Sequence, residues 1–210
     1  MTASPHSREL PAMTQPSTSV LQTLERRDRA GISEIGDYGQ IQSLPEIWSL
    51  AAERYGTRLA MDDPHNQPSA KLTFQDLWAA IQQFAAGLQG LGMQPRTHAA
   101  LFADNSHRWV IADQGIMAAG GIDAVRSAQA ETEELRYIAE HSDSTILIVE
   151  NLKLWQRLSD RFQDLPMQFA VLLSDETVPE YTPFKMLNYS QLLEVGTQNT
   201  WQSVAVTPDS

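Results

Sequence analysis

The 210-residue chain contains no cysteine. This absence excludes disulfide bonds, thiolate nucleophiles, and cysteine-ligated zinc or iron–sulfur sites. Positive charge is also scarce, because 15 Lys and Arg residues stand against 26 Asp and Glu residues and the formal net charge is -11 at pH 7. A chain of that sign repels a nucleic-acid backbone, so nucleic acid is not an expected partner. Nucleotides stay open as ligands, since backbone N–H groups can bind phosphate whatever the net charge.

Long apolar runs are missing as well. The most apolar stretch, Trp109 to Val125, is interrupted by Asp113, Gln114 and Asp123. It therefore falls short of the roughly 20 apolar residues that a membrane-spanning helix requires. The first 19 residues are rich in Ser, Thr and Pro and lack the apolar region of a secretory signal. We expect a cytoplasmic protein, at most peripheral to a membrane.

The composition, 42% hydrophobic and 20% charged, is that of an ordinary globular protein. The length accommodates one medium domain, or one domain with an irregular extension. We expect a disordered leader at residues 1–19 and an N-terminal extension at residues 20–43. Residues 44–210 are expected to form the globular part.

The clearest helix signal lies between residues 73 and 92. Thr73 and Asp76 have the spacing of a capping box, in which two side chains and two backbone N–H groups bond reciprocally. Apolar residues then recur every three or four positions and so share one helix face. They are Leu77, Ile81, Phe84, Leu88 and Leu91. Gly92 follows where a glycine commonly ends a helix.

Elsewhere, short apolar stretches typical of buried strands alternate with stretches of helical periodicity. Strands are expected at 58–61, 97–103, 122–125, 144–149 and 169–173. Helices are expected from 44 to about 56, at 73–92, at 107–119, after residue 131, at 152–162 and near 190–195. Strands that alternate with helices through short turns predict parallel βαβ units and a doubly wound α/β domain.

The sequence contains no complete phosphate-binding motif. The spacing of Gly115 and Gly120 matches a Walker A loop, but Gly121 and Ile122 follow where Lys and Ser or Thr are required. No GxGxxG sequence is present, so a Rossmann dinucleotide fingerprint is also excluded.

Asp104, Ser106 and His107 supply the residue types of a hydrolase triad. They lie within four positions on one predicted strand-to-helix turn, whereas triad members normally converge from separate elements. No GxSxG elbow accompanies them. We expect a helix N-cap and a solvated histidine instead.

The remaining candidates favour structural roles. The histidines are His6, His65, His98, His107 and His141, and they show no metal-ligand spacing such as HExxH. His98 is expected to make a structural hydrogen bond within a strand. Glu133 and Glu134 are expected to stabilise a helix start, and Trp109 to pack in the core. We therefore assign no catalytic, no cofactor-binding and no metal-ligating residue.

Taken in order along the chain, several segments resemble a known family. LTFQDL, followed by FAAGLQGLGMQ, resembles the opening of AMP-forming adenylate-forming enzymes. HAALFADNSHRWVIADQGIMAAGGIDAV resembles the family's next strand, Asn-centred turn, Trp-bearing helix and following strand. AETEELRYIAEHSDSTILIVEN and FAVLLSD resemble the elements that come after.

The stretch from Ala103 to Ala130 is similar to long-chain acyl-CoA synthetases and acyl-ACP synthetases of cyanobacterial and plastid type. The resemblance covers residues 44 to about 195, and its constant order makes it specific. Residues 94–97 depart from the family, whose members commonly carry a Gly-Asp pair there.

The resemblance implies the N-terminal subdomain of the adenylate-forming ligase fold, followed by the remainder of the ligase. It implies a reaction in which a fatty acid attacks ATP·Mg²⁺ to give acyl-AMP, before the thiol of CoA or acyl carrier protein takes the acyl group. The family's phosphate loop, adenine and Mg²⁺ motif, ribose-binding aspartate and C-terminal lysine come later than this sequence. The phosphate loop is expected within a few residues of 204–210, so this chain alone is expected to be inactive.

Two other hypotheses stay open. The chain could act as a stand-alone α/β module that binds a nucleotide or an acyl ligand. It could also dock on a full-length ligase as an interaction partner.

Overall fold

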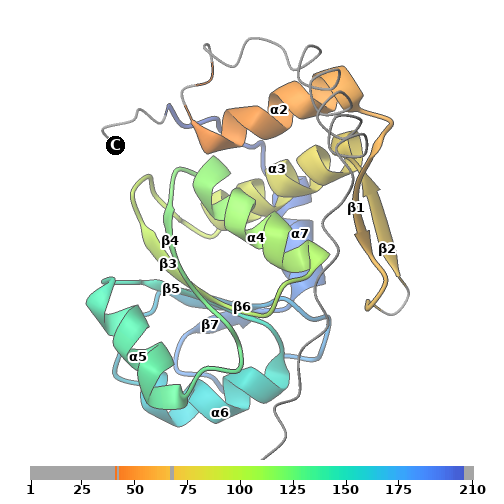
Figure 1. The fold of residues 1–210 in the computed structure, drawn as a ribbon. Coiled ribbons are helices and arrows are strands. Elements are labelled where there is room, and N and C mark those ends of the chain that lie inside the picture. The colour runs from red at the N-terminus through yellow and green to blue at the C-terminus, as the bar shows by residue number, and fades with distance from the viewer. Residues whose placement is uncertain (1–40, 42, 67–68, 206–210) are drawn as a thin grey trace, which may run out of the picture. The chain divides into compact units, whose positions relative to one another are not determined.

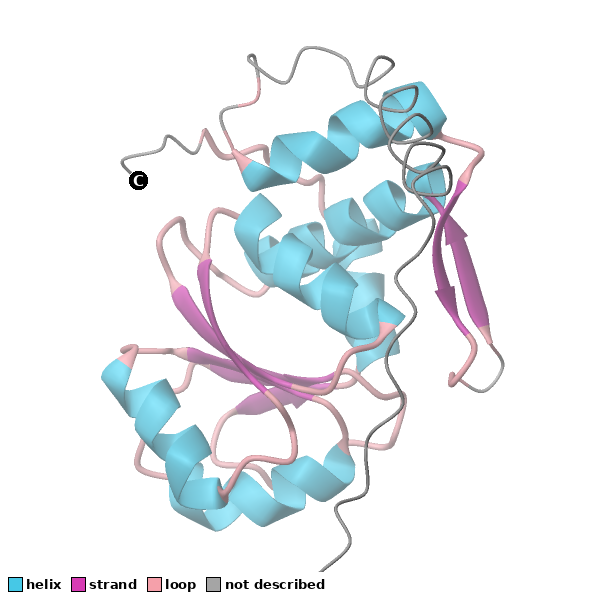
Figure 2. Cartoon of the chain, viewed as in Figure 1, coloured by secondary structure: helices cyan, strands magenta, loops and turns pink. Residues whose placement is uncertain are grey.

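The computed structural model describes residue 41 and residues 43–66 and 69–205 (Figures 1 and 2). The leader expected at residues 1–19 and nearly all of the extension expected at residues 20–43 lie outside the described residues.

A five-stranded parallel sheet forms the centre of the described part. Its strands in chain order are β3 (His98–Phe102), β4 (Ile122–Arg126), β5 (Ile146–Val149), β6 (Phe169–Leu172) and β7 (Lys185–Leu187). In space they follow the order β4-β3-β5-β6-β7, and every neighbouring pair is parallel. All residues of β5 and β6 are buried, as expected of parallel strands that are covered on both faces.

Helices cover both faces of this sheet (Figure 1). One layer consists of α5 (Thr132–His141) and α6 (Leu152–Phe162). The other consists of α3 (Phe74–Gly90), α4 (His107–Ala118) and α7 (Tyr189–Gln198), and α2 (Leu44–Tyr55) packs against α3 and α4 on their outer side. The doubly wound α/β class predicted from the sequence is confirmed.

Alternation along the strands divides the core into two clusters. In β5, Ile146 and Ile148 face the layer of α3 and α4, whereas Leu147 and Val149 face the layer of α5 and α6. Successive side chains of a strand point to opposite faces, so a continuous apolar run can fill both clusters.

Helix α3 begins and ends as its sequence predicts. The Thr73 hydroxyl accepts a hydrogen bond from the Asp76 N–H at 3.2 Å, and the Asp76 carboxylate accepts one from the Thr73 N–H at 3.1 Å. At the other end Gly92 has a φ of 102°. Its N–H donates to the carbonyl of Gln89, and the Met93 N–H donates to that of Leu88, which is a Schellman ending.

Two short strands were not expected from the sequence. β1 (Leu59–Asp63) was expected, but its antiparallel partner β2 (Ala70–Thr73) was not. β7, with three residues, was missed as well. Three or four residues contain too few repeats for a period to be recognised, so these strands are defined by their pairing partners.

No helix among the described residues combines the length and the apolar content needed to cross a membrane.

Candidate functional site

The strand order changes direction between β3 and β5. From β3 the chain passes to β4 on one side, and β5 then pairs with β3 on the other side. Doubly wound sheets bind ligands outside the carboxyl ends of the strands at such a switch point. A hollow of about 490 Å³ lies there, between the residues that follow β3, β5 and β6. This position makes it the candidate functional site.

The first helix that begins at the hollow is α4. The Ser106 hydroxyl accepts a hydrogen bond from the Trp109 N–H at 3.1 Å, which confirms Ser106 as an N-cap. The Asp63 carboxylate, at the end of β1, accepts hydrogen bonds from the His107 N–H at 3.1 Å and from His107 Nδ1 at 2.9 Å. The bond from the His107 side chain, followed by the one from its backbone, lowers the pKa of Asp63 to about 2.

The expectation of a solvated His107 was therefore wrong. Its side chain is 12% exposed and binds Asp63 across 44 positions of sequence. The hairpin of β1 and β2 supplies this partner, and half of that hairpin was not foreseen.

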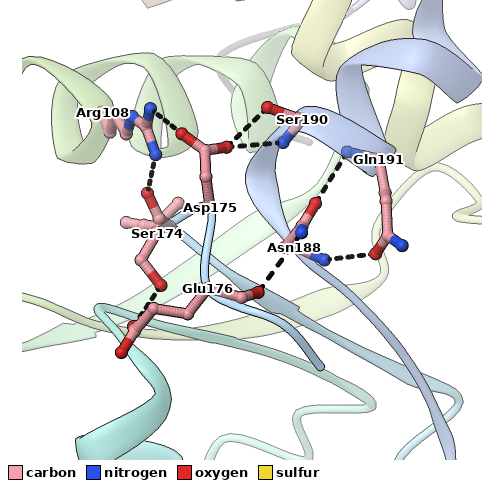
Figure 3. A network of polar contacts seen from close by, with 8 residues as sticks. Arg108, Ser174, Asp175, Glu176, Asn188, Ser190 and Gln191 are labelled. Atoms are coloured by element: carbon pink, nitrogen blue, oxygen red, sulfur yellow. Dashed lines mark hydrogen bonds and ion pairs between the residues drawn. The ribbon is translucent and has the colours of Figure 1, made fainter. Parts of the chain in front are cut away.

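The second helix at the hollow is α6. Its N-cap, Asn151, accepts a hydrogen bond from the Leu154 N–H at 2.9 Å. The Glu176 carboxylate, from the loop after β6, accepts one from the Leu152 N–H at 2.9 Å. The Ser174 hydroxyl donates to the same Glu176 oxygen at 2.6 Å (Figure 3).

The third helix at this edge is α7. Figure 3 shows the Asp175 carboxylate between Arg108 and Ser190. It accepts hydrogen bonds from the Ser190 N–H at 3.1 Å and hydroxyl at 2.6 Å, and it forms an ion pair with Arg108. Arg108 also donates to the Leu173 carbonyl at 2.7 Å and lies over the ring of Tyr189. Partial burial favours the neutral acid, but the bonds from Ser190 and Arg108 outweigh it and lower the pKa of Asp175.

Each of these three helix starts thus holds a carboxylate from another element: Asp63 at α4, Glu176 at α6 and Asp175 at α7. A helix N-terminus is the usual backbone site for a phosphate group. Here a phosphate would have to displace a built-in carboxylate and would meet further negative charge. The described residues at this edge therefore do not form a binding site for the phosphate groups of a nucleoside triphosphate.

Two further acidic side chains line the hollow, those of Asp104 and Glu150, and both already accept hydrogen bonds. The Asp104 carboxylate accepts bonds from the Ser127 hydroxyl at 2.6 Å and from the Gln129 amide at 3.0 Å, and these bonds lower its pKa. Glu150 accepts a bond from the Asp104 N–H at 3.0 Å. These contacts tie the loops after β3, β4 and β5 together, which is a structural role.

Neither the hydrolase-triad candidates nor the Walker A-like stretch forms a site among the described residues. Asp104, Ser106 and His107 bond to separate partners and do not converge as a triad. The stretch from Gly115 to Gly120 belongs to α4 and its end, and is not a phosphate loop.

His98, in β3, contacts the Ser142 carbonyl through Nδ1. Glu133 and Glu134 lie in the first turn of α5, where Glu134 pairs with Arg126 at 2.7 Å. Trp109 packs, partly buried, against the cluster on the α3 and α4 side. In the described ranges no group of three or more His, Asp or Glu side chains is arranged to hold a metal ion.

Sequence reasoning missed the residues that close this edge. Asp63, Arg108, Asp175 and Glu176 match no motif, and the partners that they meet on other elements at this edge lie 15 to 67 positions away. The one available signal was position, because Asp175 and Glu176 follow a predicted buried strand almost directly. In a parallel sheet such residues gather at the carboxyl edge.

Comparison with known proteins gives a consistent result. Residues 48–206 match the model of the family described as AMP-binding enzyme. Over 160 residues the chain is 38% identical to the chloroplastic long-chain-fatty-acid–acyl-carrier-protein ligase AEE15 of Arabidopsis thaliana, covering 71% of this chain and 22% of that protein. The chain thus spans about a fifth of the length of the curated relatives it matches.

Solved structures share the fold. The coronafacic acid ligase of Pectobacterium brasiliense superposes with a TM-score of 0.68 at 12% identity, over 79% of this chain and 32% of that one. The fatty acid AMP ligase of Legionella pneumophila gives a TM-score of 0.58 at 17% identity, over 81% of this chain and 27% of that one.

Proposed function

Because the chain belongs to the AMP-binding enzyme family, we propose that it is the N-terminal part of an acyl-activating ligase for long-chain fatty acids. One observation carries the proposal: the colinear 38% identity to a protein named as a long-chain-fatty-acid–acyl-carrier-protein ligase. The family match over residues 48–206 and the shared fold support it.

In this proposal the carboxylate of a fatty acid attacks the α-phosphate of ATP·Mg²⁺ in the whole ligase, which gives acyl-AMP and releases pyrophosphate. The thiol of CoA or acyl carrier protein then takes the acyl group and releases AMP. The described residues contribute the α/β scaffold. No chemical step is assigned to them, because carboxylates occupy the helix starts at the carboxyl edge of the sheet. The phosphate-binding groups then come from the rest of the ligase.

A stand-alone module that binds an acyl ligand is the second candidate, favoured by the hollow of about 490 Å³ at the switch point, whose carboxylates do not fit a nucleoside triphosphate. A saturating ligand that binds only the folded state at 100 times its Kd would stabilise the chain by about 2.7 kcal/mol. Melting the 210-residue chain with ATP, and separately with palmitate, tests this candidate. The ligase proposal predicts no shift with either.

The decisive experiment replaces the matching 160 residues of the Arabidopsis relative with those of this chain. We expect the chimera to catalyse palmitate-dependent exchange of pyrophosphate into ATP, and the 210-residue chain alone to catalyse none. A second chimera with Tyr181→Lys, an exposed loop position, serves as a matched control and should retain exchange. A folded, soluble chimera without exchange would contradict the proposal, and so would exchange by the isolated chain.

A cytoplasmic location stays a prediction. The two plant relatives with 37–38% identity are named as chloroplastic proteins.

A further inference from the structure

A pocket of about 260 Å³ lies between α2 and the helices α3 and α4 (Figure 1). Its walls come from four segments of the chain, which are the first half of α2, the first half of α3, the end of α4 and residues 201–204. It shares no lining residue with the hollow at the switch point. The two cavities are therefore separate sites.

Two tryptophans form the main apolar wall of this pocket. The rings of Trp78 in α3 and Trp201 lie nearly at right angles, with an interplanar angle of 85° and 5.4 Å between their centroids. Met117 of α4 and Pro45 of α2 add further apolar surface. Sites for small molecules are typically lined in this way, by aromatic and apolar side chains with a few polar groups among them.

The wall formed by residues 201–204 is fixed in place by side-chain bonds. The Trp201 indole N–H donates to the Ala118 carbonyl at 3.1 Å. The side-chain amide of Gln89 in α3 donates to the Gln202 carbonyl at 2.9 Å and accepts from the Gln202 N–H at 2.9 Å. This wall is therefore already formed without a ligand, so little ordering entropy is lost when one binds.

Helix α2 is the wall that yields most easily. None of its residues is buried, and its N-cap Ser43 makes no side-chain cap bond. The Trp48 indole N–H ties it to α4 through a hydrogen bond to the Gln114 side chain at 2.6 Å. Segments with few buried contacts open at a low free-energy cost, so we expect a ligand to enter by displacement of α2.

The polar groups of the pocket favour an uncharged ligand. Glu46 is the one charged side chain among the described lining residues; it is exposed and accepts a hydrogen bond from the Ser43 hydroxyl at 2.8 Å. A charged head group would lose its hydration here without a buried partner of opposite charge, and that loss is costly. Ser49, Gln82 and Ser203 supply groups that can hydrogen-bond to a hydroxyl or an amide.

The volume limits the size of the ligand. An apolar cavity of about 150 Å³ holds one benzene molecule, so by proportion a pocket of about 260 Å³ holds roughly ten non-hydrogen atoms. A long-chain fatty acid is larger than this and carries a charge. The pocket therefore does not suit the substrate of the proposed ligase reaction.

We propose that this pocket binds a small uncharged amphiphile, whose apolar body packs against Trp78 and Trp201 and whose hydroxyl or amide head bonds to the serine and glutamine side chains. The inference goes beyond the proposed ligase function and does not depend on it. A bound molecule would join α2 to residues 201–204, which lie far from α2 along the chain. The ligand would thus stabilise α2 in its packed position.

Titration of the 210-residue chain with 1-octanol, followed by calorimetry, tests the proposal. We expect saturable binding at a single site with a Kd of about 1 mM or below, as is usual for a ligand of this size. Octanoate has the same chain length but a charged head, and should bind at least about 10-fold more weakly. Absence of saturable octanol binding would overturn the proposal, and so would equal affinities for octanol and octanoate.

A substitution that fills the pocket locates the site. Ser49 is an exposed lining residue of α2, so Ser49→Trp should leave the melting temperature of the chain unchanged while its ring occupies the pocket and abolishes octanol binding. Gln156→Trp, at an exposed position of α6, is the matched control and should bind octanol as the wild type does. Octanol binding that survives in Ser49→Trp would contradict this location.

Hydrogen exchange gives an independent readout of where the ligand acts. At an octanol concentration ten times the Kd, the amides of α2 should exchange about 10-fold more slowly, because α2 must leave the bound ligand before they open. The amide of Tyr181, a residue that is 86% exposed in the loop after β6, should exchange at the same rate with and without octanol. Unchanged exchange in α2 under saturating octanol would refute the site.

Discussion

Helices α3 and α7 approach each other closely through glycines. A Cβ at Gly196 of α7 would lie 2.1 Å from the Gln83 carbonyl oxygen, and one at Gly87 of α3 would lie 2.6 Å from the Leu192 carbonyl oxygen. Both obstacles are backbone atoms, so they cannot rotate away. Gly196→Ala should therefore force the two helices apart by roughly 1 Å to restore van der Waals contact.

The cost of this substitution can be worked out term by term. Overpacking of a core contact costs about 2 kcal/mol. Separation also weakens the hydrogen bond from Gln83 Nε2 to the Leu193 carbonyl, now 3.0 Å, which is worth about 1 kcal/mol. Alanine has a higher helix propensity than glycine, and this difference offsets about 1 kcal/mol of the loss in stability. The net loss is about 2 kcal/mol, which lowers the melting temperature by about 4–8 °C for a domain of this size.

Thermal and urea unfolding followed by circular dichroism measure this loss. Gly90→Ala is the matched control, because its added Cβ would meet the Asn199 and Val195 side chains, which can move. We expect that variant to remain within about 0.5 kcal/mol of the wild type. If Gly196→Ala melts at or above the wild-type temperature, the close approach of α3 and α7 contributes nothing and the reasoning fails.

Two further predictions concern a carboxyl pair and a helix cap. Burial, together with the hydrogen bond that the protonated Asp123 donates to Asp113 and the repulsion between the two carboxylates, raises the pKa of Asp123 to about 7. The native state then keeps a proton that the unfolded chain loses above its ordinary value near 4, so stability falls as pH rises from 4 to 7 and is lowest above 7. Asp123→Asn should therefore raise the melting temperature more at pH 8 than at pH 5, and equal shifts would contradict this assignment. Thr73→Ala removes the side-chain acceptor for the Asp76 N–H and should cost about 1 kcal/mol in urea unfolding. Ser43→Ala, at a helix start without a side-chain cap bond, should cost less than about 0.5 kcal/mol, and an equal loss in both variants would show that the cap is not the cause.

Elements with local signals were predictable from the sequence. The helix expected at 152–162 is α6, and the apolar run ending at Val149 is β5. Their information lies in spacings of two to four residues. The capping box of Thr73 is of the same kind, since all its atoms come from four consecutive positions.

Features that depend on distant partners were not predictable. β2 and β7 exist because β1 and β6 pair with them. His107 was expected in solvent, yet Asp63 binds it from 44 positions away. The carboxylates at the helix starts likewise meet partners that lie 15 to 44 positions away.

The two helical layers differ in how far apart along the chain their members lie. The core on the α5 and α6 side is built from residues 128–172, joined by Ala100 and Phe102 of β3. The core on the opposite side spans residues 77–192 and is completed by Trp48 and Trp201, near both limits of the described region. Contacts of low sequence separation form at a smaller entropic cost, so the α5 and α6 side has the lower contact order. We therefore expect fraying of either terminal segment to open the α3 and α4 side first, and the amides of the segment from β5 to β6 to be the last of the domain to exchange.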